Sequence, residues 1–315
     1  MPPSTINGGD TVLIRAFVPA HITAFFVPVF HDDPLEAGSL GAGINLEKGT
    51  NVFTSIETGT LERHVHITFN GEPVKKEDAV ISYSVAEKIV PKDFIGEVEI
   101  WQYFDFPNGH GFGNSAGGAL GTALALSYAF GGTWLKAAQI AHEAEVRHKG
   151  GLGDVIAQLA GGIEVRVKAG GPGVGVVDNL FFEDYRVLVV PLGKLSTREV
   201  LDGDVVKAIE IEGRKALEEL LKEPTPERLM ALARAFAERT GLLSGELLEL
   251  ARELDKVIST PSSMIMLGKG LFTLVKEQEV NGIKAILADL EVPYDIVGIY
   301  EGKPKVERWF EEGKK

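Results

Sequence analysis

Residues 107–118 read Pro-Asn-Gly-His-Gly-Phe-Gly-Asn-Ser-Ala-Gly-Gly and form the most informative stretch of the chain. An alternating segment at 98–104 precedes the stretch and predicts a strand, whereas small residues at 116–130 follow it and predict a helix. Glycines allow tight turns that bring backbone N–H groups toward a polyanion, and the first turn of a helix adds unpaired N–H groups and a positive dipole end. The stretch therefore predicts a phosphate-binding loop. A glycine turn that only packs against a strand is the alternative from the residues alone.

Two common nucleotide motifs do not account for this loop. It lacks the Gly-Lys-Ser/Thr ending of a Walker A sequence. Residues 111–116 match the dinucleotide pattern with alanine in third place, but no acidic residue stands about 20 positions further on to hold a ribose. An NAD-dependent oxidoreductase is therefore a minor alternative.

Composition limits the classes of partner. The chain has 315 residues, 44% of them hydrophobic, and a formal net charge of −13 without a basic run, which disfavours nucleic acid and anionic membranes as partners. There is no cysteine, which fits a reducing cytoplasm and excludes disulfides and a cysteine nucleophile. No apolar stretch reaches the roughly 20 residues that a membrane-spanning helix needs.

The order of predicted elements favours an α/β protein of two units. Residues 1–12 are expected to be a flexible tail, 13–182 the unit with the phosphate loop, and 183–315 a second unit of helices and strands. The sequence GSLGAG at 38–43 is expected to be a loop between strands. Two-fold symmetry is the commonest arrangement of oligomers, so a homodimer is expected.

Two carboxylates follow the small-residue helix. Glu145 lies near the end of a predicted helix and Asp154 at the start of the next, so the glycines between them can turn both side chains toward a bound phosphate. A carboxylate at a helix N-terminus is expected to be ionised. From spacing alone, a solvated helix face for Glu145 and an ordinary helix cap for Asp154 are equally compatible.

The glycine-rich stretch resembles the second motif of the GHMP kinase superfamily, Pro-x-Gly-x-Gly-Leu-Gly-Ser-Ser-Ala, with Phe112 and Asn114 as the departures. Residues 18–22, VPAHI, resemble the first motif, with His21 where many members carry lysine, and 262–270 is the candidate for the third. The resemblance implies a two-domain α/β (α+β) fold, with an N-terminal unit like a ribosomal-protein domain and a ferredoxin-like C-terminal unit.

The same resemblance implies roles for individual residues. Asp154 would face the attacking hydroxyl, and Ser115 with Glu145 would hold Mg²⁺ beside ATP. The ATP and phosphate contacts would come from the loop itself: Pro107, Gly109, Gly111, Phe112, Gly113, Asn114, Ser115, Ala116 and Gly117.

Within the superfamily, the pattern is most similar to archaeal members that phosphorylate pantoate to 4-phosphopantoate for coenzyme A biosynthesis. Pantoate carries one carboxylate and two hydroxyls, and Arg166 on a predicted strand has the planar fork that suits a carboxylate. The resemblance adds Ser39, His142 and His21 as substrate-binding residues. Kinases of homoserine or mevalonate, and a non-catalytic nucleotide-binding regulator, remain the rival interpretations.

Overall fold

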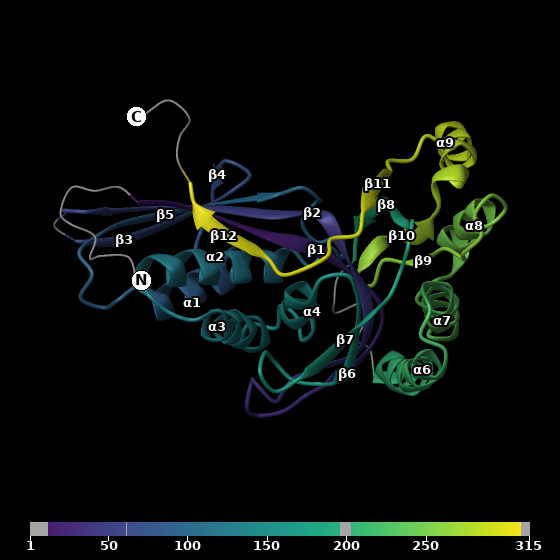
Figure 1. The fold of residues 1–315 in the computed structure, drawn as a ribbon, viewed down its shortest axis with the longest axis horizontal. Coiled ribbons are helices and arrows are strands. Elements are labelled where there is room, and N and C mark those ends of the chain that lie inside the picture. Colours follow the sequence, from purple (N-terminus) through teal and green to yellow (C-terminus); the bar gives the residue numbers. More distant parts are fainter. Residues whose placement is uncertain (1–11, 61, 196–202, 310–315) are drawn as a thin grey trace.

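The computed structural model describes residues 12–60, 62–195 and 203–309 (Figure 1). The expected tail at 1–12 lies outside the described residues except for Val12, which begins the first strand. None of the helices in the described ranges is long and apolar enough to cross a membrane.

The larger sheet has eight strands and contains most of the N-terminal half of the chain. Its path is β12-β1-β2-β5-β3-β4, and β6 pairs with both β2 and β7. The long strand β2 pairs with β5 over residues 50–58 and with β6 over 41–44, so it joins two halves of the sheet. The strands are β1 (Val12–Val29), β2 (Gly38–Thr58), β3 (Arg63–Phe69), β4 (Glu72–Pro73), β5 (Gly96–Phe104), β6 (Ile163–Lys168), β7 (Val176–Leu180) and β12 (Lys305–Arg308).

Four helices lie on one face of this sheet (Figure 1): α1 (Val80–Ile89), α2 (Asn114–Phe130), α3 (Trp134–Arg147) and α4 (Asp154–Ala160). The small residues of α2 allow it to approach the sheet closely. A Cβ added at Gly118 would lie 2.3 Å from Oε1 of Gln102, and one at Gly121 would lie 2.4 Å from Cγ2 of Val52. The predicted order of strand, glycine loop and helix is confirmed in β5 and α2.

The smaller sheet has the order β11-β8-β10-β9. In Figure 1, helices lie along the side of this sheet that faces away from the larger sheet. The elements are β8 (Arg186–Lys194), β9 (Ser263–Met264), β10 (Gly268–Val275), β11 (Asp295–Gly298), α6 (Gly203–Lys222), α7 (Pro226–Arg239), α8 (Gly245–Leu254), a 3₁₀ turn (Glu277–Glu279) and α9 (Val280–Asp289).

The two sheets share one hydrophobic core. A single cluster of buried side chains includes Phe25 and Ile44 of the larger sheet, Val189 of the smaller one and Phe236 of α7. The Phe25 and Phe236 rings lie 6.3 Å apart. After β11 the chain returns, and β12 pairs with β1 in the larger sheet. The division into 13–182 and 183–315 stays a prediction.

The prediction of a loop at residues 38–43 is wrong, because this segment is the first part of β2. A Cβ at Gly38 would lie 2.2 Å from the backbone nitrogen of Gly170, and one at Gly43 would lie 2.2 Å from Nε2 of His21. These glycines therefore allow close packing around an extended strand, a use that cannot be told from a turn in the sequence alone.

Candidate active site

The predicted phosphate loop connects β5 to α2 and depends on its glycines. Gly109 and Gly111 have φ of 81°, and Gly113, which precedes the first residue of α2, has φ of 65°. These values lie in the left-handed region, where side chains with a Cβ are strained. Alternating glycines are therefore a requirement of this backbone shape.

The side chains of Phe112 and Asn114 are buried and stabilise the conformation of the loop. The Phe112 ring stacks on Phe106 at 4.2 Å, and Nδ2 of Asn114 donates to the Phe106 carbonyl at 2.8 Å and to Oδ1 of Asn108 at 2.7 Å. Both positions depart from the superfamily motif. Their side chains form internal contacts, so any contact between phosphate and these two residues would involve the backbone.

The remaining loop residues divide by exposure. Ala116 is buried, and a Cβ at Gly117 would lie 2.5 Å from Oγ1 of Thr50, so these two residues pack against the sheet. Pro107, Gly109 and Ser115 are exposed. Contacts from the loop to ATP stay a prediction.

The candidate third motif, residues 262–270, lies directly against the phosphate loop. A Cβ at Gly111 would lie 2.5 Å from the Met266 carbonyl oxygen, and one at Gly268 would lie 2.0 Å from the carbonyl oxygen of His110. The turn between β9 and β10 of the smaller sheet therefore contacts the phosphate loop, and its role as the third motif stays a prediction.

Ser115 and Glu145 are in direct contact. The exposed Ser115 hydroxyl donates to Oε1 of Glu145 at 2.5 Å. Glu145 is 2% exposed, and burial raises its pKa to about 8; the Ser115 hydrogen bond opposes this increase, and the charge of Asp154 adds a smaller one. The predicted pair of metal ligands is thus brought together.

Asp154 begins α4 and lies beside the phosphate loop. A Cβ at Gly113 would lie 3.5 Å from Cγ of Asp154. Burial alone would raise the pKa of Asp154, but the hydrogen bond from His21 and the charges of His21 and Arg166 outweigh burial and lower the pKa below its ordinary value. The carboxyl is therefore ionised at neutral pH, and the cause includes neighbours that the helix-dipole argument did not identify.

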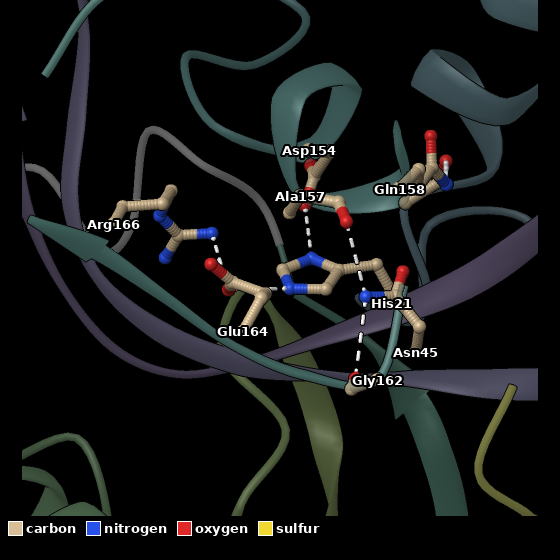
Figure 2. A network of polar contacts seen from close by, with 9 residues as sticks. His21, Asn45, Asp154, Ala157, Gln158, Gly162, Glu164 and Arg166 are labelled. Atoms are coloured by element: carbon tan, nitrogen blue, oxygen red, sulfur yellow. Dashed lines mark hydrogen bonds and ion pairs between the residues drawn. The ribbon is translucent and has the colours of Figure 1, made fainter. Parts of the chain in front are cut away.

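Two amides that the sequence did not single out fix α4 in place. Nδ2 of Asn45 donates to the Ala157 carbonyl at 3.0 Å, and Nε2 of Gln158 donates to the Gly113 carbonyl at 3.1 Å. Asn45 comes from β2 and contacts α4 as Figure 2 shows, so these two bonds attach α4 to both the sheet and the phosphate loop. No local pattern marks either residue.

His21 requires a correction. It was expected among the substrate-binding residues, but its side chain is fully buried and both ring nitrogens face carboxylates. Nδ1 lies 2.7 Å from Oδ1 of Asp154, and Nε2 lies 3.0 Å from Oε1 of Glu164 (Figure 2). With no free ring nitrogen, His21 affects the site through these two neighbours.

Arg166 and Ser39 lie side by side next to Asp154. A Cβ at Gly153 would lie 2.2 Å from Oγ of Ser39 and 3.3 Å from Nη1 of Arg166. Nη1 of Arg166 donates to Oε1 of Glu164 at 2.9 Å. Its Nε and Nη2 are buried and have no hydrogen-bond partner in the described part of the chain. Two donors of the guanidinium are thus left for another acceptor.

His142 has a different environment from the other predicted acceptor residues. Its Nε2 lies 3.0 Å from the carbonyls of Pro34 and Ala37, just before Ser39, and is the protonated nitrogen because a carbonyl only accepts. Burial lowers its pKa despite these hydrogen bonds, so the ring is neutral near pH 7. His142 holds the turn that leads into Ser39, and direct contact with an acceptor, which would use Nδ1, stays a prediction.

Comparison with known proteins gives the same class as this geometry. The model of the GHMP kinases N terminal domain matches residues 80–162, which include the phosphate loop, Ser115, Glu145 and Asp154. The chain belongs to the GHMP kinases, which decides against the dinucleotide alternative.

Close relatives show to which group of GHMP kinases the chain belongs. A pantoate kinase of Thermococcus kodakarensis is 79% identical over 298 residues, which is 95% of this chain and 99% of that protein. The chain belongs to the pantoate kinases. A solved structure described as a phosphotransferase related to the CoA biosynthesis pathway has a TM-score of 0.92 and 78% identity, covering 94% of this chain and 99% of that one. A homoserine kinase of Cytophaga hutchinsonii shares the fold, with a TM-score of 0.67 at 16% identity, covering 96% of this chain and 99% of that one.

Proposed function

We propose that the protein transfers the γ-phosphoryl group of ATP to a hydroxyl of pantoate, which yields 4-phosphopantoate and ADP and serves coenzyme A synthesis. The observation that carries this proposal is the position of Asp154. Its carboxyl carbon lies 3.5 Å from where a Cβ at Gly113 of the phosphate loop would be, and the preceding residue, Gly153, packs against Ser39 and Arg166. Phosphate donor and hydroxy acid would therefore meet at one ionised carboxylate.

The acceptor would bind through its carboxylate at Arg166. The free Nε and Nη2 atoms of Arg166 form one edge of the guanidinium, and such an edge binds a carboxylate in a bidentate manner. The Ser39 hydroxyl would contact a second oxygen of the acceptor. This arrangement would put the acceptor hydroxyl beside Asp154, which would take the hydroxyl proton as the oxygen bonds to phosphorus and the bond to ADP breaks.

The residues near Glu145 fit a magnesium ion. Glu145 is a buried carboxyl that has no salt bridge to a lysine or arginine among the described residues, and its burial raises its pKa to about 8. A carboxylate and a hydroxyl, completed by phosphate oxygens and water, are ligands that Mg²⁺ accepts. Mg²⁺ held by Ser115 and Glu145 would neutralise charge on the phosphates. The reaction is proposed for a cytoplasmic homodimer, in line with the acidic, cysteine-free composition.

The test is ADP release from Mg-ATP by the purified protein with pantoate, pantothenate, homoserine, mevalonate or glycerate. Selective turnover of pantoate is the expected result, and carboxylate recognition predicts that pantothenate, which keeps the 4-hydroxyl but carries an amide in place of the pantoyl carboxylate, is inactive. Turnover of another hydroxy acid would overturn the substrate but retain the phosphoryl transfer. Nucleotide binding without turnover of any acceptor would favour the regulator.

A further inference from the structure

Four charged side chains form a buried chain behind the proposed acceptor site (Figure 2). The order is Asp154, His21, Glu164 and Arg166, and each contact joins opposite charges at 2.7, 3.0 and 2.9 Å. The His21 and Glu164 side chains are fully buried and that of Arg166 is 1% exposed, whereas that of Asp154 is 29% exposed. Asp154 is therefore the end of the chain that is accessible to solvent.

The geometry fixes the number of protons on His21. A neutral imidazole donates from one nitrogen and accepts at the other, but here both nitrogens face carboxylate oxygens. With both carboxylates ionised, each ring nitrogen carries a hydrogen, and the resulting imidazolium balances one carboxylate as Arg166 balances the other. Burial alone lowers the pKa of His21, but the hydrogen bonds to Asp154 and Glu164 outweigh it and raise the pKa above the ordinary value.

The backbone around His21 leaves its ring little freedom. The His21 N–H donates to the Phe112 carbonyl at 3.0 Å, which ties this point of β1 to the phosphate loop. Gly43 on the neighbouring strand has no room for a side chain, since a Cβ there would lie 2.2 Å from Nε2 of His21 and 2.9 Å from Oε1 of Glu164. The imidazole is thus confined between two strands and α4.

The free oxygen of Asp154 faces the proposed metal ligand. A Cβ at Gly151 would lie 3.3 Å from Oδ2 of Asp154 and 3.2 Å from Oε2 of Glu145. Oδ1 is occupied by His21, so Oδ2 is the oxygen on the side where donor and acceptor would meet.

We propose that His21 is a positioning residue that holds Oδ1 of Asp154 and so directs Oδ2 to the acceptor hydroxyl, while Glu164 and Arg166 fix the far side of the ring. The inference rests on the proposed phosphoryl transfer. It implies that the base and the acceptor carboxylate are oriented by the same chain of contacts, because Arg166 belongs both to this chain and to the proposed acceptor site.

Two amide substitutions separate the two contacts of His21. In His21→Asn the side-chain nitrogen takes the position of Nδ1 and can still donate to Asp154, whereas in His21→Gln it takes the position of Nε2 and donates to Glu164. Steady-state rates with Mg-ATP and whichever acceptor the wild type uses, together with melting temperatures, would be compared for both variants. His148→Gln, which replaces an exposed histidine at the end of α3, is the matched control.

We expect His21→Gln to lower kcat about 100-fold and His21→Asn to lower it by about tenfold or less, because only the former releases Asp154. Both should have similar melting temperatures and a KM for ATP within about twofold of the wild-type value. His148→Gln should match the wild type. Equal losses of kcat in the two folded variants, or a larger loss in His21→Asn, would show that His21 only supports the fold.

A second measurement decides the question if the variants do not fold or if the wild type phosphorylates none of the acceptors. Nitrogen NMR of the wild-type protein should show His21 with both ring nitrogens protonated, and Asp154→Asn should shift the Nδ1 resonance more than the Nε2 resonance. An unprotonated Nδ1, or one that does not respond to Asp154→Asn, would overturn the positioning role. A protein with the expected spectrum but no kinase activity would instead overturn the proposed function and leave the contact between His21 and Asp154 established.

Discussion

The Ser115 hydroxyl donates to Oε1 of Glu145 at 2.5 Å, which joins the start of α2 to the end of α3 beside the phosphate loop. This contact puts an exposed hydroxyl next to a carboxyl that is 2% exposed. The carboxyl prefers its proton in this environment, and this preference makes the stability of the metal-free protein depend on pH.

Glu145 has a pKa near 4.5 when unfolded and about 8 when folded, so the folded state binds its proton more tightly. Its contribution to stability is fully present below the lower pKa and is lost as pH rises through the higher one. The melting temperature of metal-free wild type should therefore fall relative to Glu145→Gln between about pH 5 and pH 9. His21 is present in both proteins, so its titration largely cancels in the comparison. Mg²⁺ with nucleotide should reduce the difference, and a pH-independent difference would contradict the raised pKa.

Asp154→Asn tests the proposed base. The amide cannot accept the hydroxyl proton, so kcat should fall by about 100- to 10,000-fold. The affinity for ATP, measured by calorimetry, should change little, because Asp154 approaches the loop without bonding to it. Turnover near the wild-type rate would remove Asp154 from the mechanism.

Arg166→Ala should raise the KM for the acceptor and also destabilise the fold. The substitution leaves Glu164, which is fully buried, without its guanidinium partner, and breaking a buried pair costs about 3–5 kcal/mol. The double variant Arg166→Ala/Glu164→Gln should recover part of that stability in denaturant unfolding but keep the raised KM. A double variant with restored KM would assign Arg166 a purely structural role, and a loss of ATP affinity would assign Arg166 to the nucleotide.

Gly43→Ala should disturb the buried chain without changing any of its charges. The new methyl group would collide with Nε2 of His21, so both the melting temperature and kcat should fall. Gly282→Ala in α9 is the matched control, since its Cβ would meet Val257 at an ordinary 3.5 Å and the helix should gain about 0.5–1 kcal/mol. Equal behaviour of the two variants would contradict the close packing at Gly43.

Local signals predicted the part of the site that is continuous in sequence. The glycine loop, Ser115 and the two carboxylates at the ends of consecutive helices are each marked by residues a few positions away, and the structure brings them together. The chemistry of helix ends and tight turns is local, so a single sequence contains it.

The partners of Asp154 could not be predicted in the same way. His21 and Glu164 are 143 positions apart and meet only because β2 pairs with β1 on one side and with β6 on the other. That register depends on the packing of the whole sheet. The prediction of a loop at the first glycines of β2 was wrong for the same reason, since the segments that approach them closely are distant in sequence.

The return of β12 to the larger sheet makes the smaller sheet and its helices an insertion with two covalent connections to the larger sheet. The second connection passes directly behind the site, where the Tyr300 N–H donates to the Asn45 carbonyl at 2.9 Å and the Gly162 N–H donates to the Tyr300 carbonyl at 2.7 Å. A displacement of the smaller sheet would therefore be passed through these two hydrogen bonds to β2 and to the start of β6, the strands that carry Asn45 and Arg166.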